Sequence, residues 1–109
     1  MYHESVDYAK LAEKATNLLI EATEGNERIG NLFHTDLGKK LIMESIYKAA
    51  ELATKRVKNL RKSQEFAVWF SNEYENRTGQ RSPDKITNIV REICVNVLTP
   101  YKKLFFSGD

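Results

Sequence analysis

The chain has 109 residues, of which 41% are hydrophobic and 29% charged, and its formal net charge is +2. These values fit one globular domain with its own core and exclude a disordered chain, and the small net charge excludes a dedicated DNA-coating protein. The charge is nevertheless uneven. Residues 1–30 carry six acids and three bases, whereas residues 31–109 carry nine acids and fourteen bases. We therefore expect a single domain over residues 1–109 with one basic face.

The first predicted helix begins after Ser5, the expected N-cap, and ends at Gly25, a residue that tolerates a positive φ angle. Asp7 would then lie in the first turn, where the helix dipole favours an acid. Apolar residues recur every third or fourth position along this segment and would form one buried stripe. The stripe contains Tyr8, Leu11, Ala12, Ala15, Leu18, Leu19 and Ala22.

The second predicted helix covers residues 36–62 and is the longest. At about 1.5 Å per residue it would extend roughly 40 Å. It contains no proline, and Thr35 or Asp36 can cap its first turn. Its apolar side is formed by Ile42, Ile46, Ala49, Ala53, Val57 and Leu60.

A third helical segment covers residues 64–76 and ends at Gly79, and periodicity leaves open whether it continues the second helix. The fourth helix starts at Ser82, the expected N-cap, with Pro83 as the first helical residue. Pro100 interrupts this helix, and a short fifth helix toward the C-terminus stays open.

Four helices with apolar stripes and short connections predict an all-α fold, an antiparallel four-helix bundle. No segment shows the alternation of period two that marks a strand, so we expect no sheet. Cys94 is the single cysteine and falls on the apolar side of the fourth helix, so we expect an inert core thiol and no intrachain disulfide.

The sequence contains neither an export signal nor a run of about 18 apolar residues. Its two histidines lie 31 residues apart and no cysteine pair accompanies them, so no set of metal ligands can be recognised. We therefore expect a cytoplasmic protein that contacts no membrane and needs no metal or cofactor.

The five consecutive apolar residues 66–70 surround a helix on all sides, so one neighbouring helix cannot cover them. The uncovered part must meet another bundle helix, the aromatic tail or a second chain. We favour a small non-enzymatic interaction or regulatory module that presents this helical face to a protein partner, including a second copy of itself in a homodimer. Large aromatic residues dominate interface energetics. The predicted contacts are Trp69, Phe70, Tyr74, Phe105 and Phe106.

Nucleic-acid binding is the alternative, because lysines of the second helix fall on one side of it and the basic loop at residues 76–82 leads into a helix N-terminus. The predicted phosphate contacts are Lys55, Lys58, Arg61, Lys62, Arg77 and Arg81. Glu44 and Glu51 each precede a lysine by four positions, however, an order that is also typical of a solvated surface with ion pairs. A bacteriocin-immunity-like or phage accessory protein is a further alternative, since such proteins are small basic helical bundles.

Enzymatic chemistry would centre on His34, whose surroundings are similar to two family patterns. Gly38 stands four positions after His34, as a glycine does in the histidine phosphotransfer motif, although Leu37 replaces the lysine of that motif. Arg28 and His34 are similar to the Arg-x5-His pattern of HEPN ribonucleases. These resemblances imply phosphoryl transfer or RNA cleavage at His34. Because the second helix is predicted to start after His34, we instead expect a loop or capping histidine and no catalytic residue.

Overall fold

The computed structural model describes residues 6–26, 29, 31–54 and 60–101. Within them lie four long α-helices, and this part of the chain contains no β-strand. In chain order the helices are α1 (Tyr8–Ala22), α3 (Asp36–Thr54), α4 (Gln64–Thr78) and α5 (Asp84–Leu98). The short 3-10 helices are η1 (Asn31–His34), η2 (Leu60–Lys62) and η3 (Thr99–Tyr101).

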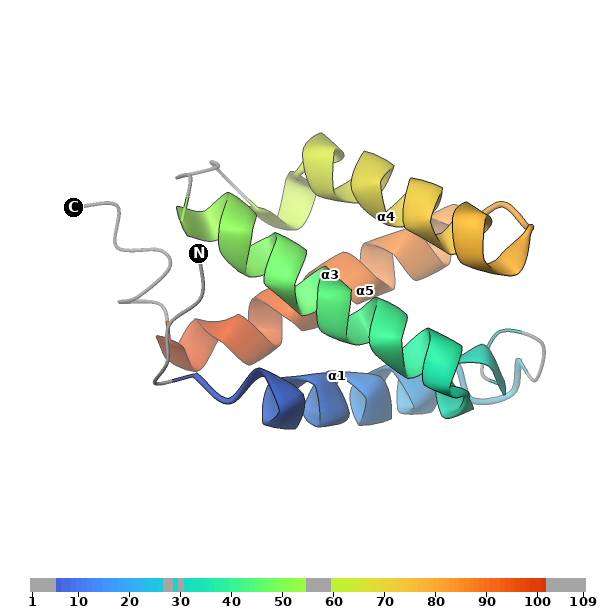
Figure 1. Cartoon of the computed structure of the whole chain (residues 1–109), viewed down its shortest axis with the longest axis horizontal. Coiled ribbons are helices and arrows are strands. Elements are labelled where there is room, and N and C mark those ends of the chain that lie inside the picture. The colour runs from blue at the N-terminus through green and yellow to red at the C-terminus, as the bar shows by residue number, and fades with distance from the viewer. Residues whose placement is uncertain (1–5, 27–28, 30, 55–59, 102–109) are drawn as a thin grey trace.

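The four helices form an antiparallel bundle, which confirms the predicted fold class (Figure 1). Each long helix runs opposite to the one before it, and α3 and α5 cross in the middle of the bundle. The outer helix α1 contacts both α3 and α5, and α4 contacts the same pair from the other side. The two outer helices therefore lie on opposite sides of a central α3–α5 pair.

The core draws apolar side chains from all four helices and from η1, as the helical stripes predict. Helix α3 buries Ala49, Ala50 and Ala53, whose short side chains allow neighbouring helices to approach closely. Cys94 is fully buried, and this burial raises the pKa of its thiol, so the thiolate needed for reactivity is rare. The largest fully buried side chains include Phe33, Phe66, Phe70, Leu19, Leu41, Ile42, Ile46, Leu52 and Leu98.

Side-chain caps fix where the first two helices begin. The Asp7 carboxylate accepts a hydrogen bond from the backbone N–H of Lys10 at 3.1 Å, so Asp7 is the N-cap of α1 and not a first-turn residue. Ser5, the expected cap, lies outside the described residues. The Thr35 hydroxyl accepts from the N–H of Gly38 at 3.1 Å, which confirms one of the two caps predicted for α3.

A break separates α3 from α4, so the single helix predicted over residues 36–62 is wrong. In the described chain α3 ends at Thr54, residues 55–59 lie outside the description, and η2 is a 3-10 helix. Ser63 then has an extended backbone with ψ of 118°, and its hydroxyl accepts from the N–H of Phe66 at 3.2 Å. This N-cap makes α4 a separate helix, although α3 remains the longest described helix with 19 residues.

The ends of α4 and α5 differ in how well the sequence marks them. Gly79 adopts a φ of 73° directly after α4 and donates its N–H to the carbonyl of Glu75, which confirms the predicted stop. At α5 the N-cap is Pro83, and it makes no side-chain cap hydrogen bond. The Ser82 hydroxyl instead lies 2.8 Å from the Thr87 hydroxyl in a buried contact, so the predicted serine cap is wrong. After α5 the described chain contains η3, and residues 102–109, for which a short fifth helix was left open, lie outside it.

Candidate interaction surface

Helix α4 has apolar residues on two faces, as the run at residues 66–70 predicts, and the inner face is buried. Phe66 and Phe70 are fully buried and Tyr74 is 6% exposed. Their rings follow one another along the core, with centroids about 6 Å apart. Neither Phe70 nor Tyr74 is therefore available to a partner, and the structure removes both from the predicted partner surface.

The outer face of α4 retains part of the predicted contact region. Val68 is 58% exposed, the highest exposure of any large hydrophobic residue in the described chain. Trp69 is half-buried and packs against the core beside Phe66. The remaining predicted contacts, Phe105 and Phe106, lie outside the described residues.

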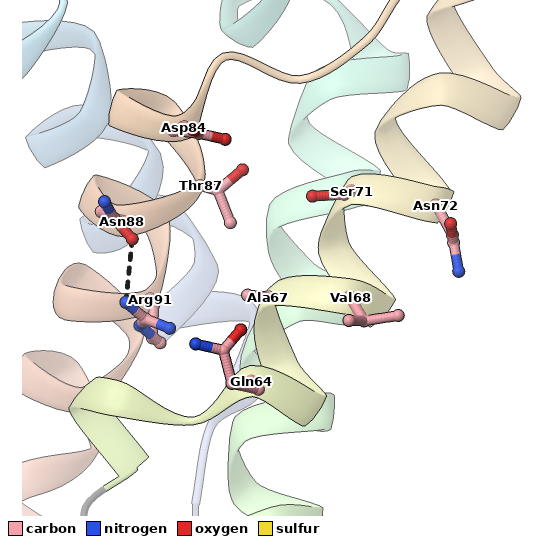
Figure 2. Close-up of a pocket in the computed structure, with 9 residues that line it drawn as sticks. All are labelled: Gln64, Ala67, Val68, Ser71, Asn72, Asp84, Thr87, Asn88 and Arg91. Carbon is pink, nitrogen blue, oxygen red and sulfur yellow. Dashed lines mark hydrogen bonds between the residues drawn. The ribbon is translucent and has the colours of Figure 1, made fainter.

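A groove of about 500 Å³ runs between α4 and α5 next to Val68 (Figure 2). Figure 2 shows Ser71 of α4 pointing toward α5 and Thr87, whereas Val68 and Asn72 lie at the outer edge of the groove and point away from α5. Most of the lining is polar but uncharged, so the groove offers many hydrogen-bonding groups beside a small apolar surface. The lining residues are Gln64, Ala67, Val68, Ser71, Asn72, Asp84, Thr87, Asn88 and Arg91.

Arg91 supplies the positive charge of this groove. One terminal nitrogen of its guanidinium donates to the carbonyl of Ser63 at 2.9 Å, and the other donates to the side-chain oxygen of Asn88 at 2.8 Å. The Nε atom is buried without a hydrogen-bond partner. No ion pair joins Arg91 to a carboxylate of the described residues. The guanidinium is thus held in one orientation while its charge remains uncompensated within the described chain.

Asp84 supplies the negative charge at the other end of the groove. It precedes Arg91 by two turns of α5, which corresponds to about 10 Å along the helix. Asp84 also forms no ion pair with a described residue. The groove therefore carries one acid and one base at its two ends.

The predicted phosphate contacts are not gathered on one free surface. The Arg77 side chain is 17% exposed and lies between α3 and α4, where it donates to both carboxylate oxygens of Glu44 at 2.8 Å and to Glu73 at 2.6 Å. Glu44 therefore pairs with Arg77 and not with Lys48, which lies 3.5 Å from Glu51. This arrangement satisfies Arg77 within the bundle.

Arg61 is likewise engaged, because it donates to Glu92 at 3.0 Å and to Asn96 at 2.8 Å on α5. Lys62 and Arg81 are exposed, but they lie at separate places, Lys62 at the end of η2 and Arg81 before α5. Lys55 and Lys58 lie outside the described residues. A continuous basic face is therefore not assembled by the described members of the predicted set.

His34 lies at the end of η1, is exposed, and precedes α3, which places it in a short connector as expected. No three histidine, cysteine or acidic side chains of the described residues gather as metal ligands would. Within the same residues, no helix has both the length and the apolar character needed to cross a bilayer.

Sequence analysis missed Arg91 and the groove beside it. The available signal was the spacing of Asp84, Asn88 and Arg91, which places three polar side chains on one side of a helix whose other side is apolar. That spacing does not show that α4 lies alongside. No protein-family model, curated protein or solved structure matches this chain, so its function is inferred from its own surface.

Proposed function

We propose that this chain is a non-enzymatic helical interaction module that binds a protein partner through the groove between α4 and α5. The observation that carries the proposal is the fixed and uncompensated guanidinium of Arg91. A cation that is already held in place loses little conformational entropy when it meets an anion. A carboxylate of the partner is the group that best complements it.

The other residues that line the groove indicate which further groups the partner would carry. Ala67 and the exposed Val68 offer a small apolar surface, while Gln64 and Ser71 offer hydrogen bonds along the same wall. A groove between two helices suits a third helix laid along it. Because the acid and the base of the groove lie two turns apart, the partner helix would carry a base and an acid about seven positions apart.

A phosphate backbone is supported less well as the occupant of this groove. Asp84 would repel phosphates at one end of it. Two of the predicted phosphate contacts, Arg61 and Arg77, already pair with carboxylates of the bundle. These observations favour a protein partner over the nucleic-acid alternative.

A displayed library of helical peptides tests this proposal without knowledge of the natural partner. We expect the peptides enriched on the immobilised chain to share a carboxylate and a base about seven positions apart, matching the charges of the groove. Fluorescence anisotropy then measures their affinity. Val68→Asp replaces the exposed apolar residue of the groove with a charge and should weaken binding at least about tenfold, which is roughly 1.4 kcal/mol. Leu37→Asp is the matched control, because Leu37 is also an exposed apolar residue but lies on α3 outside the groove.

Arg91 needs a separate comparison, because it also supports the carbonyl of Ser63. Arg91→Gln should abolish binding, whereas Arg91→Lys should retain part of it. Lysine keeps the positive charge but lacks the two terminal guanidinium nitrogens that can bind both oxygens of a carboxylate. The thermal unfolding temperature of both variants shows whether weaker binding comes from the altered groove or from an unfolded chain. Enriched peptides that lack a carboxylate, or that bind the Val68→Asp variant as tightly as the original chain, would contradict the proposal.

A further inference from the structure

A second surface lies on the other side of α5, where this helix meets α1. We name it the α1–α5 face and define it by Leu18 and Ala22 of α1 with Ile89 and Ile93 of α5. Leu18 is 37% exposed and Ala22 is exposed, whereas the two isoleucines are half-buried. These side chains line a shallow apolar depression of about 520 Å³. An exposed apolar area rimmed by polar residues is typical of a protein contact.

The charges of α1 are ordered along this face. Lys14 precedes Leu18 by four positions, and Glu21 follows it by three. Both are exposed, and neither forms an ion pair with a described residue. Lys14 and Glu21 are about 10 Å apart along the helix, too far to pair within one chain. Next to Leu18, α1 therefore carries a base on its N-terminal side and an acid on its C-terminal side.

This pair of charges can satisfy itself between two copies of the chain. When two copies of α1 pack antiparallel about a two-fold axis near Leu18, Lys14 of one copy lies opposite Glu21 of the second copy. The symmetry forms this pair twice. A parallel arrangement would instead place like charges against each other. Glu13 is also exposed on α1, but it projects about 140° away from Leu18 around the helix, on the side away from the α1–α5 face.

We infer that the chain forms a two-fold symmetric dimer in which the α1–α5 faces of two copies pack against each other. The apolar residues of the face supply the centre of the contact, and the ordered charges of α1 supply its direction and rim. A 15-residue helix and one edge of its neighbour form a contact at the small end of specific interfaces. The dimer is therefore weak, with a dissociation constant of about micromolar order, and it weakens further as salt is added.

This inference goes beyond the proposed function and does not depend on it. The outer helices α1 and α4 lie on opposite sides of the α3–α5 pair, so dimerisation through α1 leaves α4 free (Figure 1). Of the residues that line the groove and the α1–α5 depression, Asn88 is common to both and stands at the rim of each. A dimer would present two copies of the groove and bind a two-site partner more tightly than one copy does.

Sedimentation velocity over a concentration series tests the dimer. Lys14→Glu alone and Glu21→Lys alone each create like-charge contacts across the axis and should raise the dissociation constant at least about tenfold. The double variant carries both reversals in every copy, restores opposite charges across the axis, and should return to within about threefold of the original value. Lys40→Glu is the matched control, since it makes the same charge change on α3.

Leu18→Ser tests the apolar centre, and Leu37→Ser is its control on α3. Only the first should abolish the dimer, while far-ultraviolet circular dichroism shows that both variants fold. A monomer at every concentration reached, or a dimer that neither single charge reversal weakens, would overturn the inference. A double variant as weak as the single ones would also overturn it. Peptide binding in the α4–α5 groove is read separately, so loss of the dimer and loss of the groove are distinguishable.

Discussion

Replacing Gly38 with alanine should strongly destabilise the chain, although glycine-to-alanine changes inside helices normally stabilise. The usual gain from this change is about 1 kcal/mol in helix propensity. Gly38 differs because its Cα lies directly against the backbone of Leu32 and Phe33 in η1. A Cβ atom built there would lie 2.1 Å from the carbonyl oxygen of Leu32 and 3.0 Å from the Cα of Phe33.

An ordinary contact begins near 3.4 Å, so the backbone at Leu32 would have to move by more than an ångström. That carbonyl also accepts the N–H of Thr35 at 3.1 Å, and Thr35 is the N-cap of α3. Phe33, next in the chain, is fully buried and would move with it. A lost cap and a strained core position each cost about 1–3 kcal/mol. We therefore expect a net destabilisation of about 2–4 kcal/mol, or a fall in Tm of roughly 10–20 °C.

Urea denaturation followed by circular dichroism measures this difference. Lys39→Ala is the control at the next position, where an exposed side chain should change the free energy of unfolding by less than about 0.5 kcal/mol. A Gly38→Ala variant as stable as the original chain would refute the close approach of η1 to α3.

Three further predictions concern the core and its ion pairs. Because burial raises the pKa of Cys94 in the folded chain, the unfolded thiol ionises first, and stability should fall by up to about 1.4 kcal/mol per pH unit above roughly pH 8.5. Urea titrations from pH 7 to 10 should show a shallower decline for Cys94→Ala, and equal slopes would contradict this. Arg77→Met leaves two carboxylates unpaired between α3 and α4 and should lower the free energy of unfolding by about 1–3 kcal/mol. Arg61→Met removes an exposed pair and should lower it by less than about 1 kcal/mol. Equal losses of unfolding free energy in urea denaturation would contradict this prediction. Phe70→Ala should lower the free energy of unfolding by about 3–5 kcal/mol, because Phe70 is fully buried. Val68→Asp should leave that free energy nearly unchanged but abolish binding in the peptide assay. A Val68→Asp variant that is less stable than Phe70→Ala would contradict the burial of these two side chains.

The sequence predicts the helices well wherever local chemistry sets them. The apolar stripes of α1 and α5 have a period of 3.6 residues, and Gly79 stops α4 because its left-handed backbone favours glycine. Thr35 was also recognisable as a cap. These features depend on residues a few positions apart, so they can be recognised in one chain without knowledge of its packing.

Features that depend on distant residues were not predictable in this way. The break before α4 uses the cap at Ser63, and its carbonyl is held by Arg91 from α5, 28 positions later. Arg77 is equally hidden, because its partner Glu44 lies 33 positions earlier on α3. Periodicity records neither contact. It therefore assigns one long helix and a free arginine, whereas packing produces a break and a partly buried ion pair.

The candidate site was only partly predictable for a related reason. The apolar run at residues 66–70 correctly indicates that α4 has two apolar faces, but it cannot show which face the bundle covers. Packing buries Phe70 with the core and leaves Val68 exposed, so an aromatic residue predicted to contact the partner is inaccessible and a smaller apolar residue is accessible. The groove itself needs α5 alongside α4, and that is a property of the assembled bundle.

The most direct test of partner binding at the groove is a nuclear magnetic resonance titration of the labelled chain with an enriched helical peptide. Amide shifts should be largest over residues 64–72 of α4 and 84–91 of α5, and small over α1. Val68→Asp should remove them without changing the rest of the spectrum. Shifts centred on α1 or α3, or shifts that persist in the Val68→Asp variant, would contradict binding in the groove.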